Sequence, residues 1–205
     1  MRPAAIKKEI LSNVYFKNVM TAIQTKYNKE VIPQMMEKFG YKNHMSVPKI
    51  VKVVVNTGFG KMISGKSTSE QKQIYDAILE DLALIAGQRP VLKKTKKSIS
   101  GFKVREGMVL GAAVILRKSR MYDFLERLIN ISLPRMRDFR GIDRKSFDEK
   151  GNLTYGVKEH IIFPEILPEK VKHIFGLEIT IVTNSKTREE GLGLLTLLGF
   201  PVKQS

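Results

Sequence analysis

The segment from Gly60 to Ser67 reads GKMISGKS and has the residue types and spacing of a phosphate-binding loop, G-x-x-x-x-G-K-S. In such a loop, backbone N–H groups hold the phosphates, the lysine bonds the outer phosphate oxygens, and the hydroxyl holds Mg²⁺. The flanks agree with this, because an apolar run from Ile50 to Val55 precedes the segment and a helix-like segment beginning near Ser69 follows it. One hypothesis is therefore a nucleotide-binding protein.

The other parts of a nucleotide site are missing from the sequence. A second strand should end in an aspartate for the metal shell, but the strand predicted from Ala112 runs into Arg117 and the one ending at Thr183 runs into Asn184. Phosphate-binding loops of this kind also belong to parallel βαβ units, and the predicted elements alternate too little for that. A basic turn near RNA accounts better for these residues, with a nucleotide site at Gly60–Ser67 as the alternative.

Other catalytic or metal-binding sets are weaker still. The chain has no cysteine, which excludes disulfides, thiolate nucleophiles and cysteine-ligated zinc. Its three histidines, His44, His160 and His173, lack metal-ligand spacing. Glu159 and His160 lie at the end of a predicted strand and are expected to form a surface pair rather than an acid/base dyad. We therefore expect no enzyme, no cofactor and no metal site.

Net charge is the most informative total. Among 205 residues, 36 are Lys or Arg and 20 are Asp or Glu, which gives a formal charge of +16. A large field of one sign favours a polyanionic partner, and nucleic acid leads over an anionic membrane surface because no long basic amphipathic helix dominates the chain. The alternative is that the charge only keeps the protein soluble, through repulsion between its molecules. No apolar run approaches the ~20 residues of a membrane helix.

One stretch is uniformly positive. No acid occurs from Leu82 to Arg105, where Phe102 lies among the cations of the sequence KKTKKSISGFKVREG. The cations are Arg89, Lys93, Lys94, Lys96, Lys97, Lys103 and Arg105. Such side chains neutralise phosphates, and an exposed phenylalanine can stack on an unpaired base. We favour this interpretation over a solvated hairpin with Phe102 in the core.

A second basic cluster, from Pro134 to Asn152, mixes the two signs of charge. Its cations are Arg135, Arg137, Arg140, Arg144 and Lys145, and its acids include Asp138, Asp143 and Asp148. Mixed charges suit a protein partner better than pure phosphate binding. A flexible polar loop is the alternative.

Periodicity and capping predict an α+β fold. Helices are expected at 29–39, 69–86, 119–133 and 187–198, with stops at Gly40, Gly87 and Pro134, a cap at Ser119 and a capping box at Thr187-x-x-Glu190. Strands are expected at 47–56, 91–95, 108–117, 153–159 and 177–183, the first with Val51, Val53 and Val55 on one face. Because strands follow one another directly in two places, we expect a mostly antiparallel sheet with helices packed on one face.

The N-terminal segment is treated separately. Residues 1–28 hold a single acid, Glu9, and are expected to form a basic helical arm that orders on RNA or a partner. A mitochondrial presequence is the alternative, although such segments are rich in arginine and this one holds only Arg2. The predicted organisation is therefore an arm, 1–28, and a single RNA-binding domain, 29–205.

Four stretches together resemble the bacterial large-subunit ribosomal protein L-five family. They are VPKIVKVVVNTGFG, IAGQRPVLKKTKKSISGFKVREG, FLERLINISLPRMRDFRGIDRKSFDEKGNLTYGVKEHIIFPEI and GLEITIVTNSKTREEGLGLLTLLGFP. They cover nearly everything from about residue 29 onward. The resemblance implies a curved antiparallel sheet and a structural component of the large ribosomal subunit. It also implies that the protein binds 5S rRNA and attaches it to the 23S-type rRNA in the central protuberance.

The resemblance also implies three sets of site residues. The rRNA-binding set is Asn56 of VVNTG, Gln88 of AGQRP, and Arg117. The loop facing P-site tRNA comprises Lys93, Lys94, Lys96, Lys97, Ser98, Phe102, Lys103 and Arg105. An intersubunit bridge to small-subunit protein thirteen comprises Arg135, Arg137, Arg140, Arg144 and Lys145. The implied location is the cytoplasmic ribosome, rather than an organellar one, with no membrane partner.

The sequence departs from the family pattern in a few places. Ile115 stands where the family usually has threonine, and Ala113 stands where a basic or polar residue is common. A lost hydroxyl removes a hydrogen bond to RNA, so Ile115 is left out of the rRNA-binding set. The arm before residue 28 is longer than the family usually shows. The phosphate-loop pattern falls on a turn where the family has no such motif.

Overall fold

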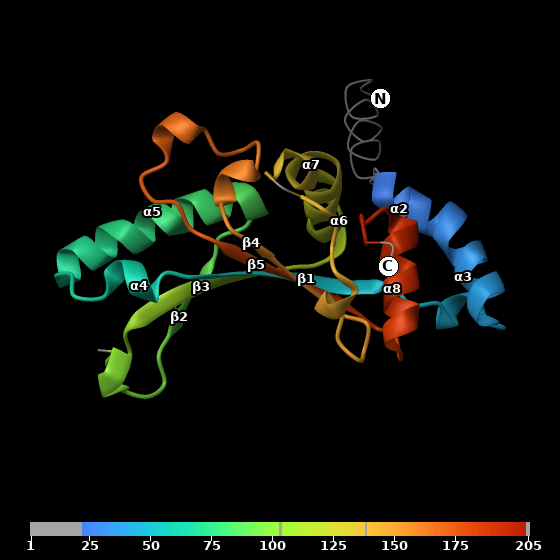
Figure 1. The fold of residues 1–205 in the computed structure, drawn as a ribbon, viewed down its shortest axis with the longest axis horizontal. Helices are drawn as coiled ribbons and strands as arrows, with labels where there is room; N and C mark the ends of the chain where they lie inside the picture. Colours follow the sequence, from blue (N-terminus) through green and yellow to red (C-terminus); the bar gives the residue numbers. More distant parts are fainter. Residues whose placement is uncertain (1–21, 103, 138, 204–205) are drawn as a thin grey trace, which may run out of the picture.

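The computed structural model describes residues 22–102, 104–137 and 139–203. Most of the predicted arm, residues 1–21, therefore lies outside the described residues. From α2 onward, helices and strands follow the order predicted from the sequence, apart from the added short α4 (Gly60–Ile63) (Figure 1). The α+β class is confirmed.

The strands form one open sheet. In the described part these are β1 (Ile50–Gly58), β2 (Val91–Lys94), β3 (Val109–Leu116), β4 (Leu153–Val157) and β5 (Leu177–Thr183). Their order across the sheet is β2-β3-β1-β5-β4, and every neighbouring pair is antiparallel. The central β1 joins β3 to β5, so segments far apart in sequence lie side by side.

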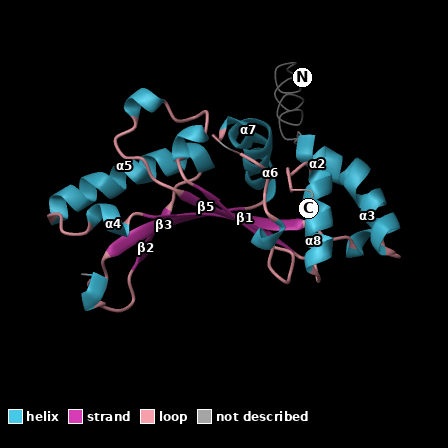
Figure 2. Ribbon diagram, in the orientation of Figure 1, coloured by secondary structure: helices cyan, strands magenta, loops and turns pink. Residues whose placement is uncertain are grey.

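Helices cover one face of this sheet. α5 (Thr68–Ala86), α6 (Lys118–Arg127) and α7 (Leu133–Arg135) lie along it, while α2 (Ala22–Lys26), α3 (Ile32–Phe39) and α8 (Arg188–Leu198) group at one end (Figure 2). The covered face carries buried Val53 and Val55 of β1 and their partners Ile181 and Ile179 of β5. Because side chains alternate along a strand, residues at the intervening positions form a second face, which we call the open face.

The start of β1 corrects one predicted alternation. Val51 was expected to share a face with Val53 and Val55, but it is 43% exposed while Ile50 is buried. The ladder between β1 and β5 shifts register between Ile50 and Lys52. A bulge adds one residue to one strand, so the side chains that precede it lie on the opposite face from the one that strict alternation predicts.

Two prolines lie inside helices, each just after a π-helical turn, and one of them corrects a predicted helix end. Pro134 was expected to stop a helix at residue 133, but a π-helical turn, Leu128–Ser132, joins α6 to α7 and the helix runs through Pro134 to Arg135. A second π turn, Tyr27–Val31, precedes Pro33 in α3 in the same way. A proline ring clashes with the carbonyl four residues earlier, and a wider turn at that point accommodates it.

Other helix ends follow local sequence signals. α3, α5 and α8 end at Gly40, Gly87 and Gly199, each with a positive φ of 70°, 63° and 107°. Glycine tolerates this left-handed conformation without a Cβ clash. The predicted cap at Ser119 is wrong, because Arg117 occupies the N-cap position of α6 and makes no side-chain capping bond.

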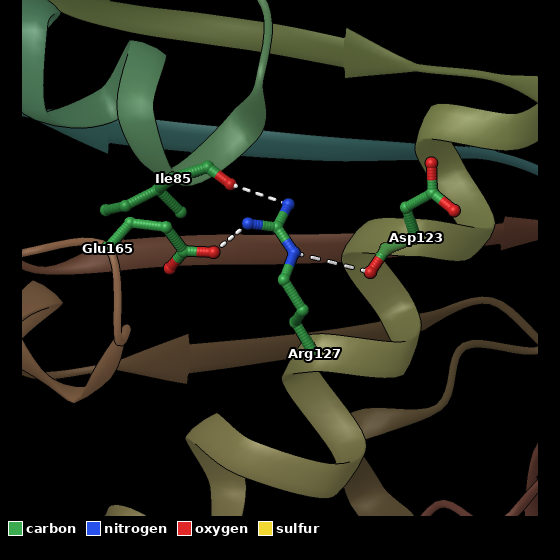
Figure 3. A network of polar contacts seen from close by, with 4 residues as sticks. All are labelled: Ile85, Asp123, Arg127 and Glu165. Atoms are coloured by element: carbon green, nitrogen blue, oxygen red, sulfur yellow. Dashed lines mark hydrogen bonds and ion pairs between the residues drawn. The ribbon is translucent and has the colours of Figure 1, made fainter.

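The long connection from β4 to β5 is tied to the helices through Arg127 (Figure 3). This α6 residue donates to Glu165 Oε1 in the connection and, at 3.2 Å, to the carbonyl of Ile85 at the end of α5. Its Nε also donates to Asp123 O at 3.4 Å. The guanidinium is partly buried, and burial lowers its pKa. One side chain therefore joins three segments.

His160 in the same connection corrects the expected surface pair. Its ring is fully buried and stacks on Phe175 with centroids 3.9 Å apart. Nδ1 accepts the N–H of Phe175 at 3.4 Å, and Nε2 lies 3.5 Å from Asp81 Oδ2 of α5. Glu159 stays exposed. Burial lowers the pKa of His160, so the imidazole is held neutral against the core.

Candidate nucleic-acid interface

The open face of the sheet carries polar side chains among apolar ones such as Val54 and Ile115. Register pairing aligns Ala113 of β3, Asn56 of β1 and Glu178 of β5 in one row across the sheet. Asn56 Nδ2 donates to Glu178 Oε2 at 3.2 Å, which fixes the orientation of the amide. In the next row, the hydroxyls of Thr154 and Thr180 lie 3.3 Å apart. Amides and hydroxyls at this spacing can bond ribose and base edges.

Gln88 is anchored at the same end of β3 as Arg117. It lies between α5 and β2, and its Nε2 donates at 3.4 Å to the carbonyl of Ile115, beyond the last β3 residue that pairs with β2. Its Oε1 accepts from Arg120 of α6 at 3.3 Å. Arg117 follows β3 in an extended conformation, with φ −141° and ψ 161°, and is exposed. Of the two arginines, Arg120 thus contacts Gln88 directly.

The three predicted rRNA-binding residues lie on or next to the adjacent strands β1 and β3. Asn56 of β1 pairs with Ala113 of β3, and Ile115 lies two residues further along β3 on the same face. Gln88 donates a hydrogen bond to the backbone carbonyl of Ile115. By alternation, Arg117 continues the Ala113 and Ile115 side of β3. The departures from the family pattern are also here: Ala113 is buried and Ile115 is 42% exposed. This part of the face offers amides and cations around an apolar spot.

The predicted tRNA-facing loop projects from the edge of the sheet. We call residues 93–108, the end of β2 and its connection to β3, the finger; it extends below the sheet (Figure 1). Its described lysines and Arg105 are exposed, and Phe102 is 74% exposed, which rules out a place for that ring in the core. Lys103 lies outside the described residues.

Backbone bonds give the finger a defined shape. Ile99 and Val104 exchange N–H···O bonds of 2.9 and 3.1 Å around the 3₁₀ turn Ser100–Phe102. Thr95 N donates to Met108 O, and Ser98 Oγ accepts the N–H of Glu106, both at 2.9 Å. The hairpin therefore presents its cations and Phe102 at a fixed tip.

The phosphate-loop pattern adopts a different structure from a nucleotide cradle. Residues 60–63 form α4, and the N–H groups of residues 62, 64 and 66 donate to carbonyls of the same turn. Ser67 caps α5 through a capping box with Glu70, whose Oε2 accepts from Ser67 N at 2.9 Å. Hydrogen bonds from Ser67 lower the pKa of the Glu70 carboxyl. The backbone N–H groups and the Ser67 hydroxyl that would hold a phosphate thus already have hydrogen-bond partners within the protein. The Glu70 carboxylate occupies the N-terminus of α5.

The predicted bridge residues separate into two places. Arg135 and Arg137 line a groove of about 490 Å³ with Val157 and Ile162. Arg144 instead lines a hollow between α3 and α8, where its carbonyl accepts from Arg188. Arg140 and Lys145 lie outside both. All five carry positive charge, but they do not form one cluster.

Sequence reasoning missed Glu178 and Arg120. Each contacts a predicted residue across a long separation in sequence, so no local pattern marks it. Within the described ranges, no helix is long and apolar enough to cross a bilayer. In that same part of the chain, His, Asp and Glu side chains do not gather in threes that could hold a metal ion.

Comparisons with known proteins cover most of the chain. Residues 43–105 match the family described as Ribosomal protein L5, and residues 109–202 match the model of the C-terminus of the same ribosomal family. The large ribosomal subunit protein uL5 of Geotalea daltonii is 53% identical over 184 residues, which are 90% of this chain and 99% of that protein. The protein of the same description from Halothermothrix orenii is 48% identical over 185 residues, 90% of this chain and 100% of the relative.

Proposed function

This chain belongs to the ribosomal protein L5 family and is a structural component of the large ribosomal subunit, not an enzyme; from that premise we propose that its open face binds 5S rRNA. Bound there, the protein attaches 5S rRNA to the large-subunit rRNA in the central protuberance. The observations that support this proposal are the oriented amide of Asn56 on the open face and the hydrogen bond from Gln88 to the Ile115 carbonyl of the adjacent strand, with exposed Arg117 two residues further along.

Each of these side chains suits a different part of an RNA strand. Glu178 accepts a hydrogen bond from the Asn56 amide nitrogen, so the Asn56 side-chain oxygen can accept a hydrogen bond from a ribose hydroxyl. Arg120, which contacts Gln88, and the exposed Arg117 supply charge for phosphates. Positioned amides carry discrimination, whereas the cations carry most of the salt-dependent affinity.

The finger contacts P-site tRNA in this proposal. Its exposed lysines neutralise phosphates, and the exposed ring of Phe102 is available for stacking. Because the hairpin projects beyond the sheet edge, it can reach a second RNA while the open face holds 5S rRNA.

The basic residues Arg135, Arg137, Arg140, Arg144 and Lys145 form the intersubunit bridge to small-subunit protein thirteen in this proposal, although they lie in more than one place. The groove lined by Arg135 and Arg137 has an apolar wall, which suits a protein partner better than bare phosphate. Arg144 stands apart in its own hollow and contributes a second, separate contact.

The test of 5S rRNA binding uses two amide truncations. Asn56→Ala and Gln88→Ala should each lower affinity for 5S rRNA by about 0.5–1.5 kcal/mol, the usual worth of one hydrogen bond. The matched control is Asn130→Ala, which removes an exposed amide from the helical side of the molecule. Filter binding or calorimetry with the full chain measures the difference. Parent-like affinity in both variants would remove these residues from the RNA site.

A further inference from the structure

A groove of about 720 Å³ separates α4 from the finger. One wall is the phosphate-loop pattern, which contributes Gly60, Lys61 and Ser64. The other wall and the floor come from the finger and the start of β3. The unexplained sequence motif and the finger therefore form one surface.

The groove combines an apolar floor with a cationic rim. Ile99 is 50% exposed and Phe102 is 74% exposed, and Val104 and Leu110 complete the apolar floor. Lys61, Lys96 and Lys97 supply its charge, and no acid is among the described residues that line it. A surface of this kind attracts a ligand that has both a flat apolar face and a negative charge.

The groove is built into the backbone. The finger wall is held by the paired bonds between Ile99 and Val104, so its turn does not need a ligand to form. On the opposite wall, a Cβ at Gly60 would lie 3.3 Å from Leu110 Cδ2, tighter than ordinary contact. Absence of a side chain at Gly60 thus keeps the α4 wall close to Leu110 without crowding.

We infer that this groove receives one unstacked nucleotide, with its base against Phe102 and its phosphate at Lys61, Lys96 and Lys97. This inference rests on the proposed contact between the finger and tRNA, and it extends that contact to α4. A nucleotide matches both features of the groove, because every base has a π face and every phosphate is anionic. An acidic, partly apolar peptide is the competing occupant, and the experiment includes it.

The experiment uses the full chain labelled with ¹³C at the isoleucine δ1 methyl groups, titrated with a single-stranded RNA tetranucleotide. Ring current from a bound base should move the Ile99 methyl resonance upfield, while exposed Ile174 in the β4–β5 connection serves as the internal reference. Phe102→Leu keeps an apolar side chain but removes the aromatic face, and should weaken binding at Ile99 by about tenfold.

Lys61→Gln tests the wall that does not belong to the finger. It should lower the slope of log affinity against log salt by about 0.7, the effect of one single-strand phosphate contact. The matched control is Lys170→Gln, which removes an exposed lysine from the β4–β5 connection and should leave the slope unchanged. A parent-like slope in Lys61→Gln would take α4 out of the site.

Four further outcomes decide the assignment. An Ile99 shift that is equal with an abasic tetranucleotide would overturn base stacking. If an acidic peptide moves Ile99 and the tetranucleotide does not, the groove is a protein-docking surface. If the tetranucleotide leaves Ile99 unmoved while lysine substitutions in the finger still speed tRNA release, the finger binds tRNA through phosphates alone. If the tetranucleotide shifts the Ile99 resonance but lysine substitutions in the finger leave tRNA release unchanged, the tRNA proposal is refuted. The inference that the groove binds a nucleotide then still holds.

Discussion

At the scale of single residues, Arg127 holds the β4–β5 connection to the helices (Figure 3). Arg127→Met keeps the aliphatic stem but leaves the Ile85 carbonyl and the Glu165 carboxylate without this donor. We expect the free energy of unfolding to fall by about 1–3 kcal/mol, as measured by urea denaturation. Glu165→Gln retains an oxygen acceptor and should cost less.

The control for this network is Arg89→Met, which removes an exposed guanidinium. Its effect should stay within about 0.5 kcal/mol, as for ordinary surface substitutions. Equal stability of Arg127→Met and Arg89→Met would show that the contacts of Arg127 contribute little to folding.

His160 predicts a dependence of stability on pH. Burial lowers its pKa in the folded protein, whereas the unfolded chain has the ordinary value near 6.5. Below about pH 6.5 the unfolded chain therefore binds the proton more readily, and stability should fall by at most about 1.4 kcal/mol per pH unit. The neighbouring Asp81 acts in the opposite direction at lower pH, because burial raises its pKa and the folded state then takes up the proton first.

His160→Phe isolates that effect. The variant retains an aromatic ring for stacking on Phe175 but cannot take up a proton. Urea denaturation at several values between about pH 7 and pH 5.5 should give a flatter stability profile than in the parent. A slope equal to that of the parent would assign the pH dependence to groups other than His160.

At the scale of elements, the finger is separable from the sheet. Its lysines are exposed on a hairpin whose shape comes from backbone bonds, so their charge contributes little to folding. Changing Lys94, Lys96 and Lys97 together to Ala should alter the free energy of unfolding by no more than about 0.5 kcal/mol per site. In assembled ribosomes, we expect faster dissociation of P-site tRNA and unaltered 5S rRNA occupancy.

The comparison variant for the finger changes Lys42, Lys150 and Lys170 to Ala. It removes the same charge from exposed positions elsewhere on the surface. If this variant accelerates tRNA release equally, the effect reflects net charge alone. If the finger variant loses 5S rRNA while tRNA release is unchanged, the assignment of the finger to tRNA is wrong.

At the scale of the whole molecule, a formal charge of +16 sets the mode of association. Each phosphate neutralised by a lysine or arginine releases a counterion, so log affinity for 5S rRNA should fall linearly with log salt. The expected slope is about −0.7 to −0.9 per neutralised phosphate. Titrations of the full chain from low to physiological salt measure it, and salt-independent binding would contradict the proposed function.

The sequence by itself determined what depends on neighbouring residues. Gly40, Gly87 and Gly199 end their helices as local capping rules predict or allow, and β5 has the predicted limits Leu177–Thr183. Total charge and the uninterrupted positive stretch also identified RNA as the leading partner. These properties are summed or read along the chain, so they need no knowledge of contacts between distant segments. The family resemblance then named the large ribosomal subunit.

Only the tertiary structure decided which surfaces these elements create. The strand order brings Asn56 beside Glu178, 122 residues away in sequence, and the same packing buries His160 that local sequence assigned to the surface. Phe102 could have entered the core or stayed in solvent, and the finger leaves it exposed across a groove from α4. Periodicity shows which face of a helix or strand is apolar and which is polar. Whether a given side chain is buried depends on which distant segment packs against that face, and only the folded chain determines this.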